Sequence, residues 1–285
     1  LVAPTLLASA PEAVQAAWLP KIADASALVV LAHQERGARY RLNHVAMKAV
    51  RNGSDWRLTG HKSVVPAGDE ADAFLVPARL RGAEDDEAGI GLFLVEAKAA
   101  QVRGYPTQDG ARAAEVALTD AAATLVTEDA FAVLEHAADV AIAGFCAEGV
   151  GLMDRLVAIT VEYMNQRKQF GTTLASFQAL RHRIADVKMQ LELARSMSYY
   201  ASLKLNAAPA ERRMAMARAK YQVGVSMRAI GQQSVQLHGG IGVTCEYIVS
   251  HYFRALTQME MAFGDTLHHL GEVSARMQDT AGVFA

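Results

Sequence analysis

After Glu128 the chain carries apolar residues at the spacing of an α-helix. The pattern is clearest at six positions that lie three or four residues apart: Phe177, Leu180, Ile184, Val187, Leu191 and Ala194. Such a stripe covers one face of a helix of about five turns. Residues 206–210 interrupt the pattern before it resumes, and an earlier helix is predicted over residues 131–164. Three glycines in that earlier helix permit close helix contact: Gly144, Gly149 and Gly151. The pattern predicts a bundle of three or four long antiparallel helices.

Between residues 24 and 127 the pattern is that of short strands. Turn-forming residues separate five apolar runs, at 27–32, 45–50, 73–76, 91–95 and 116–118. Asn52 and Gly53 follow the second run and precede the apolar stretch 56–58, and both residue types tolerate the positive φ of a two-residue hairpin turn. The segment predicts a small antiparallel sheet or barrel, in which the acidic loop 83–87 is a solvated turn.

The N-terminal residues read as short helical pieces that end at prolines: Pro4, Pro11 and Pro20. The chain begins at Leu1 without an initiator Met, a basic region or a cleavage site, so we treat the N-terminus as a cut edge. The pattern as a whole predicts an α+β fold. Its parts are the end of a helical domain at 1–23, a middle β-domain at 24–127 and a C-terminal helical bundle at 128–285.

Composition and charge exclude several classes of protein. The 285 residues include 28 Lys and Arg against 30 Asp and Glu. These charges are scattered, so nucleic acid is not an expected partner. Two cysteines, Cys146 and Cys245, are too few for a disulfide framework or a cysteine-rich metal site. No uninterrupted apolar run reaches the ~18 residues that a membrane span needs. We therefore expect a cytoplasmic protein without a membrane span.

A glycine-rich segment, Gln236-Leu237-His238-Gly239-Gly240-Ile241-Gly242, is the first candidate for chemistry. One interpretation is a helix C-cap and tight turn, in which glycine adopts the left-handed conformation without steric cost. The other is a close approach of backbone to a phosphate or a flat ring, with donors from Gln236 and His238. One cap does not need three glycines in four residues, which favours the second interpretation.

The second candidate is Arg167-Lys168-Gln169-Phe170-Gly171, after a helix that ends near Gln166. Arg167 could simply complement the helix dipole, and Gly171 could simply end the helix. The guanidinium would equally suit pyrophosphate oxygens, and the aromatic ring would suit adenine. Because both candidate segments fall in the predicted bundle, about 65 residues apart, together they indicate a nucleotide site.

At these two segments the chain resembles the acyl-CoA dehydrogenases. The family's Arg-x-x-Phe-Gly and Gln-x-x-Gly-Gly-x-Gly segments, its Glu-Tyr turn and a following Arg are matched here by Arg167, Phe170, Gly171, Gln236, Gly239, Gly240, Gly242, Glu246, Tyr247 and Arg254. Segments 19–22, 60–62 and 71–73 are similar to those that lead into and form the family's central sheet. The resemblance therefore covers essentially the whole chain, while most of the family's N-terminal helical domain is absent.

The resemblance implies FAD bound between the β-domain and the bundle, an acyl-CoA substrate and assembly through paired bundles. The assembly would be a homo-oligomer, or a dimer or tetramer with a related acyl-CoA dehydrogenase subunit. In that family the neighbouring subunit's bundle contacts the adenine and pyrophosphate half of FAD. The residues implied to serve the cofactor are Arg167, Gln169, Phe170, Gly171, Gln178, Gln236, His238, Gly239 and Gly240.

The family's catalytic carboxylate, which removes the α-proton of the thioester, has no match in this chain. Its position falls on Phe263 or Gly264, neither of which accepts a proton. Asp265 is adjacent, and Glu260 lies about one helical turn earlier, so these are the candidate bases. The alternative position that some relatives use is Ala141, and nearby Asp139 is interpreted as an ordinary polar helix position.

The β-domain also departs from the family pattern. The Trp-Ile-Thr segment whose ring flanks the flavin is replaced by residues 64–66, Val-Val-Pro, and the Thr-Glu-Pro segment by residues 34–36, Gln-Glu-Arg. Outside these motifs, His268 and His269 with Asp265 have no third and fourth ligand at suitable spacing, so we predict no metal site.

Two functions remain open at this stage. The first is an acyl-CoA dehydrogenase-type flavoprotein, either heteromeric, with the carboxylate on a related subunit, or homomeric, with Asp265 as base. The second is a catalytically silent structural or regulatory subunit that completes a partner's FAD site. The first is favoured because residues facing across the implied subunit boundary are kept while those of the chain's own active site are lost.

Overall fold

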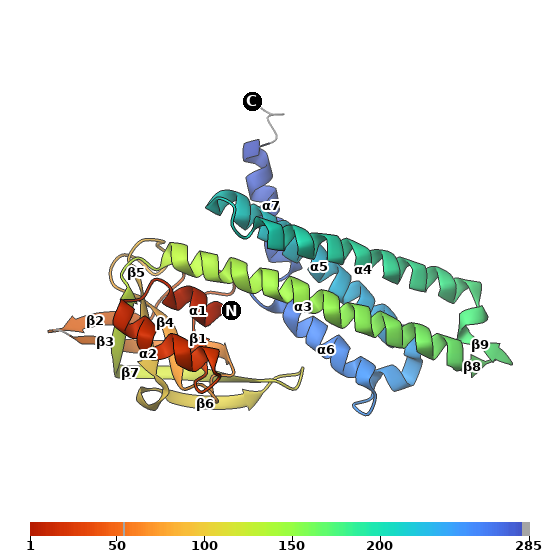
Figure 1. Cartoon of the computed structure of the whole chain (residues 1–285), viewed down its shortest axis with the longest axis horizontal. Helices are drawn as coiled ribbons and strands as arrows, with labels where there is room; N and C mark the ends of the chain where they lie inside the picture. Colours follow the sequence, from red (N-terminus) through yellow and green to blue (C-terminus); the bar gives the residue numbers. More distant parts are fainter. Residues whose placement is uncertain (54, 281–285) are drawn as a thin grey trace. The chain divides into compact units, whose positions relative to one another are not determined.

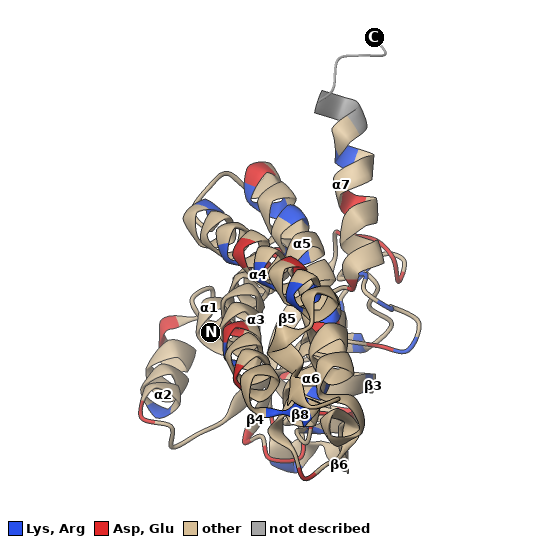
Figure 2. Ribbon diagram, turned by 90° about the vertical axis from the view of Figure 1, so that its right-hand side faces the viewer, with Lys and Arg blue, Asp and Glu red and all other residues tan. Residues whose placement is uncertain are grey.

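The computed structural model describes residues 1–53 and 55–280. Two compact units divide the chain, Leu1–Val140 and Ala141–Ala285. The last five residues of the predicted bundle, 281–285, lie outside the described part. No helix in the described residues is long and apolar enough to cross a membrane. Acidic and basic residues are mixed along α4 (Gln178–Lys204) and α7 (Thr266–Thr280), whereas α5 (Pro209–His238) carries mostly basic residues (Figure 2).

The first unit is built around a barrel of short strands (Figure 1). Its elements are α1 (Val2–Leu7), α2 (Glu12–Ala23), β1 (Val29–Leu31), β2 (Lys48–Asn52), β3 (Asp55–Pro66), β4 (Ala73–Arg79), β5 (Ile90–Glu96), the 3-10 helix η1 (Ala97–Ala99), β6 (Gln101–Pro106) and β7 (Arg112–Thr127). Strands pair in the order β2-β3-β7-β5-β4, and β4 also pairs β2, which closes five strands into a barrel. β1 adds to β4 and β6 adds to β7. The α+β fold class is confirmed.

Most strand pairs are antiparallel, as predicted, but β4 pairs in parallel with β1 and, at Lys48 and Arg79, with β2. The predicted hairpin at Asn52 is confirmed, because Asn52 pairs with Asp55 across it. Gly60 has φ of 152°, and a Cβ there would lie 2.9 Å from the Met47 backbone, so only glycine fits between β3 and the segment before β2. The barrel core includes Phe74, Phe93 and Val95.

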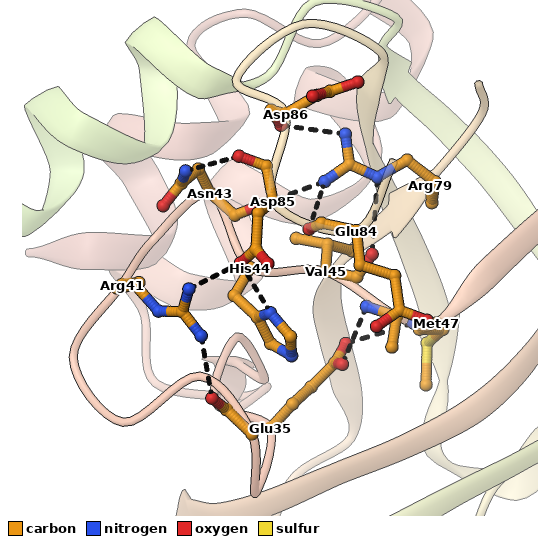
Figure 3. Close-up of polar contacts among 12 residues, drawn as sticks. Glu35, Arg41, Asn43, His44, Val45, Met47, Arg79, Glu84, Asp85 and Asp86 are labelled. Carbon is orange, nitrogen blue, oxygen red and sulfur yellow. Dashed lines mark hydrogen bonds and ion pairs between the residues drawn. The ribbon is translucent and has the colours of Figure 1, made fainter. Parts of the chain in front are cut away.

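The acidic loop 83–87 is a solvated turn, as predicted, but it has a further role. Its side chains are exposed, but its backbone wraps around the guanidinium of buried Arg79 (Figure 3). All five N–H groups of Arg79 donate to main-chain carbonyls, those of Asn43, Val45, Glu84, Asp86 and Ala88, over 2.7–3.3 Å. Asp85 accepts hydrogen bonds from Arg41 and His44, both at 2.8 Å. The loop is therefore part of a fixed junction with the segment before β2.

A buried ion pair fixes a second segment to β3. The Lys62 ammonium has no exposed surface and donates to Glu35 Oε1 over 2.7 Å. The same carboxylate accepts from the backbone N–H groups of Ala46 and Met47. Burial lowers the pKa of Lys62, and the attraction of Glu35 opposes that shift. Because removing one partner of a buried pair leaves an uncompensated charge, this pair makes the path of residues 33–47 specific.

The second unit is helical (Figure 1). Its elements are α3 (Phe131–Gln166), which begins in the first unit, β8 (Lys168–Gln169), β9 (Thr172–Thr173), the 3-10 helix η2 (Leu174–Ser176), α4 (Gln178–Lys204), α5 (Pro209–His238), the 3-10 helix η3 (Gly239–Val243), α6 (Ile248–Met261) and α7 (Thr266–Thr280). One apolar cluster draws on α3, α4, α5 and α6, through residues such as Met153, Leu191, Met227 and Leu256. The predicted helical bundle is confirmed.

Of the predicted glycines, Gly149 lies at a close helix contact and Gly151 does not. A Cβ at Gly149 would collide with the Met227 side chain of α5, whereas a Cβ at Gly151 would meet no described atom within 4 Å. On the other side of α5, buried Lys220 donates to the carbonyls of Met259, Glu260 and Gly264. An ammonium has three donors, so Lys220 satisfies carbonyls that the end of α6 leaves open.

Candidate functional site

The two motif segments lie at the same end of the helical unit. Tyr163, one turn before Arg167 on α3, stacks on His238 at the end of α5, with ring centroids 4.3 Å apart. Its hydroxyl also donates to the His238 carbonyl over 3.3 Å. Tyr247, in the turn before α6, packs against the same histidine ring. Tyr163 was missed in the sequence, where its spacing of four residues before Arg167 was the available signal.

The segment after α3 forms a short hairpin, β8–β9, whose turn is Phe170-Gly171. Both turn residues have positive φ, 52° for Phe170 and 79° for Gly171. The left-handed region is rare for a bulky side chain, and the ring of Phe170 is 92% exposed. It touches Phe177 only edge-on, with centroids 6.3 Å apart. A strained and exposed aromatic residue is typical of a contact site rather than of a structural turn.

Polar side chains around this hairpin are exposed. Arg167, Gln169 and Gln178 all face solvent. In residues 1–53 and 55–280, the Arg167 guanidinium has no hydrogen bond or ion pair, whereas its backbone carbonyl accepts from Leu174 across the hairpin. A guanidinium that is held in place through its backbone but keeps all its side-chain donors can bind an anionic group such as a phosphate.

Each of the three glycines in the other motif occupies a different structural environment. Gly239 ends α5 with φ of 64°, and its N–H bonds to carbonyls in the last turn, so the C-cap interpretation accounts for it. Gly242 is buried, and a Cβ there would lie 2.9 Å from the Val235 carbonyl. Gly240 is exposed, and a Cβ would meet no described atom within 4 Å. Its backbone, like the Gln236 side chain beside it, is open to an incoming group.

His238 lies beneath this turn with a defined tautomer. Its Nδ1 is 2.8 Å from the Ser234 carbonyl, which can only accept, so Nδ1 carries the proton of a neutral ring. Burial lowers the pKa of His238, which keeps the ring neutral at pH 7. Nε2 is buried without a partner among the described residues, as are Gln233 Oε1 and Ser234 Oγ. The expectation that His238 supplies a donor is therefore corrected: the free nitrogen is an acceptor.

Both candidate bases are used in helix capping. Asp265 Oδ1 accepts from the backbone N–H of His268 over 2.8 Å, as the N-cap of α7. Glu260 is buried, and its Oε1 accepts from the Thr266 N–H and hydroxyl and from Arg228. Gly264 has no side chain, and its φ is 105°. No carboxylate at this turn is left without a structural role.

Two other positions considered for the base, Ala141 and Asp139, are both buried. Asp139 is completely buried rather than an ordinary polar helix position. In the β-domain, Val64 stands where the family has its aromatic ring. It is 40% exposed, has φ of 51° and lies in a register shift between β3 and β7. A β-branched residue in this conformation is strained, and its side chain offers no hydrogen-bond donor to a ligand.

Comparison with known proteins identifies the family. A model described as "Acyl-CoA dehydrogenase, C-terminal domain" matches residues 128–278, more than half of the chain. The chain belongs to the acyl-CoA dehydrogenase family. Members of this family are FAD-dependent oxidoreductases that act on CH–CH bonds.

Individual relatives agree with this assignment. The chain is 30% identical over 172 residues to acyl-CoA dehydrogenase IpdE2 of Mycolicibacterium smegmatis, an alignment that covers 60% of this chain and 51% of the relative. It is 29% identical to acyl-CoA dehydrogenase FadE27 of Mycobacterium tuberculosis, over 82% of this chain and 64% of the relative. The solved Tcur3481-Tcur3483 steroid acyl-CoA dehydrogenase matches with a TM-score of 0.86 at 29% identity, over 99% of this chain and 75% of that one. The chain thus spans between half and two thirds of these curated relatives.

Proposed function

We propose that the chain is an FAD-binding subunit of an acyl-CoA dehydrogenase, and that a related polypeptide supplies the catalytic carboxylate. The substrate class is an acyl-CoA thioester that undergoes α,β-dehydrogenation. The observation that carries this proposal is a contrast within one unit. Arg167, Phe170 and Gly240, which suit a nucleotide, are exposed, and among the described residues the Arg167 guanidinium has no hydrogen bond or ion pair. Both carboxylates suited to proton abstraction instead cap a helix.

The residues present fit the nucleotide end of FAD. Arg167 would bind the pyrophosphate oxygens, Phe170 would stack on the adenine, and the open backbone at Gly240 would allow close approach of a phosphate. The amides of Gln169, Gln178 and Gln236 would donate hydrogen bonds, and His238, with Gly239, would hold this turn in place from beneath. Bound FAD would supply the hydride acceptor of the reaction. The exposure of Phe170 also supports a site completed by a second subunit.

The engagement of both candidate bases, Glu260 and Asp265, supports a second polypeptide. Abstraction of an α-proton needs a carboxylate within hydrogen-bond reach of that proton. Gly264 cannot provide one, and Asp265 would have to give up the N-cap of α7, at a cost of about 1 kcal/mol. The match to the Tcur3481-Tcur3483 enzyme, whose description joins two polypeptide names, favours the same arrangement.

The test compares the chain alone with the chain co-expressed with a related acyl-CoA dehydrogenase subunit that retains its base. We expect flavin and acyl-CoA-dependent flavin reduction only in the mixture. Arg167→Ala should reduce the flavin retained by that mixture at least tenfold. Arg155→Ala, an exposed position three turns earlier on α3, is the matched control and should retain flavin. Equal retention in both variants would refute the role of Arg167.

Asp265→Asn separates the homomeric from the heteromeric enzyme. Asn is as good an N-cap as Asp, so the variant removes only the possible base. Unchanged activity of the mixture is expected. Abolished activity would instead establish Asp265 as base in a self-sufficient chain. If Arg167→Ala had no effect on the flavin content of the mixture, the partner's own residues would hold all the flavin. That result would indicate a catalytically silent subunit.

A further inference from the structure

Three potential metal ligands come together in the first turns of α7. One nitrogen each from His268 and His269 and one oxygen of Glu272 all lie within 4.8 Å of one another. His269 Nδ1 is 3.3 Å from Glu272 Oε2, and His268 Nε2 is 3.9 Å from Oε1. Glu272 is the third ligand that sequence spacing failed to supply. Tetrahedral zinc keeps its ligand atoms about 3.4 Å apart, so rotamer adjustments of roughly 1 Å would complete the geometry.

The hydrogen bonds of His269 orient it for metal binding. The ring is fully buried, and Nε2 lies 3.0 Å from the Phe263 carbonyl, which can only accept. A neutral ring therefore carries its proton on Nε2 and presents the lone pair of Nδ1 to the Glu272 carboxylate. Two lone pairs that face each other require a cation, either a proton or a metal ion. A backbone carbonyl that binds the distal nitrogen is the usual support of a ligating histidine.

Space for the histidine pair depends on Gly264. A Cβ at this position would lie 2.5 Å from His268 Cδ2 and 2.7 Å from His269 Nε2. The two imidazoles thus occupy the volume that a side chain at position 264 would need. A side chain at position 264 and the present positions of the two imidazoles are therefore mutually exclusive.

Nearby positive charge sets the expected strength of binding. Arg213 donates to both oxygens of Glu272, from Nη2 to Oε2 over 2.6 Å and from Nε to Oε1 over 3.3 Å, and the N-terminus of α7 adds a partial positive charge. A carboxylate has about four lone-pair sites and can accept from a guanidinium while it binds a metal. We propose that His268, His269 and Glu272 bind one divalent cation of the zinc type, with water completing the coordination. Because Arg213 and the N-terminus of α7 repel the cation, we expect it to bind with micromolar rather than nanomolar affinity.

Zinc titration of the metal-stripped full chain tests the site, independently of flavin or activity. Calorimetry should show one zinc ion per chain, and cobalt should give the visible absorption of a tetrahedral nitrogen–oxygen site. His268→Ala and Glu272→Gln should each weaken zinc binding at least tenfold. His251→Ala removes an exposed histidine of α6 whose ring faces the Cys245 carbonyl, and should leave binding unchanged.

The outcomes decide the proposal. Because His268 is only partly buried, its alanine variant is expected to fold, and circular dichroism checks this. Saturable binding lost in His268→Ala but kept in His251→Ala supports the site. Absence of stoichiometric binding in the wild type, or equal binding in wild type and a folded His268→Ala, overturns it.

Discussion

The two thiols of the chain lie in opposite environments. Cys146 is completely buried in the bundle core, and burial raises its pKa to about 12, whereas Cys245 is exposed in the turn before α6. At pH 8 only about one Cys146 in ten thousand would be a thiolate, even before access is considered. We predict that a thiol reagent titrates one cysteine in the native protein and two in denaturant. In Cys245→Ser the native count should fall to zero, and rapid labelling of that variant would contradict the assignment.

At the residue scale, the sequence identified side chains that act alone and missed those that act through distant partners. Arg167 and Phe170 could be assigned to a cofactor from their chemistry and local spacing alone, and this assignment stays a prediction; the structure shows that both are exposed. The pairing of Tyr163 with His238 joins residues that are 75 positions apart. Glu272 escaped notice as a ligand because a helical spacing of i and i+4 was not combined with the adjacent His269. The capping roles of Asp265 and Glu260 depend on where a helix begins, which sequence fixes only to within a few residues.

At the element scale, Arg79 is the residue that holds two loops to the barrel. We predict that Arg79→Met lowers the free energy of unfolding by about 2–4 kcal/mol, because five carbonyls lose a charged donor and only part of them can be hydrated. Arg57→Met is the control. Its guanidinium donates to one carbonyl, that of Asp120, and its loss should cost under about 1 kcal/mol. Urea unfolding of the two variants measures the difference, and equal losses would contradict the role of Arg79.

The helices could be predicted more completely than the strands. The periodicity through Leu191 extends over many turns, so burial of one face repeats often enough to be read from sequence. β6 was missed because its residues are mostly exposed and show no alternation. β7 runs over sixteen residues, but its many alanines have low strand propensity, and only the apolar residues near Val116 indicated a strand. Its length is determined by pairing with β3, β5 and β6.

At the scale of the whole molecule, residues that suit a cofactor lower the stability of the isolated chain. Phe170 exposes a large apolar ring and holds a positive φ that disfavours a side chain. Glycine adopts that conformation without strain, so Phe170→Gly should stabilise the chain alone by about 0.5–1 kcal/mol. The same change should reduce flavin retention in the complex with the base-bearing subunit, because the ring that would stack on adenine is gone. Thermal unfolding of the chain alone and flavin content of the complex measure the two effects. Opposite signs are expected if Phe170 is kept for binding, whereas a loss of stability in the isolated chain would show that the ring serves the fold.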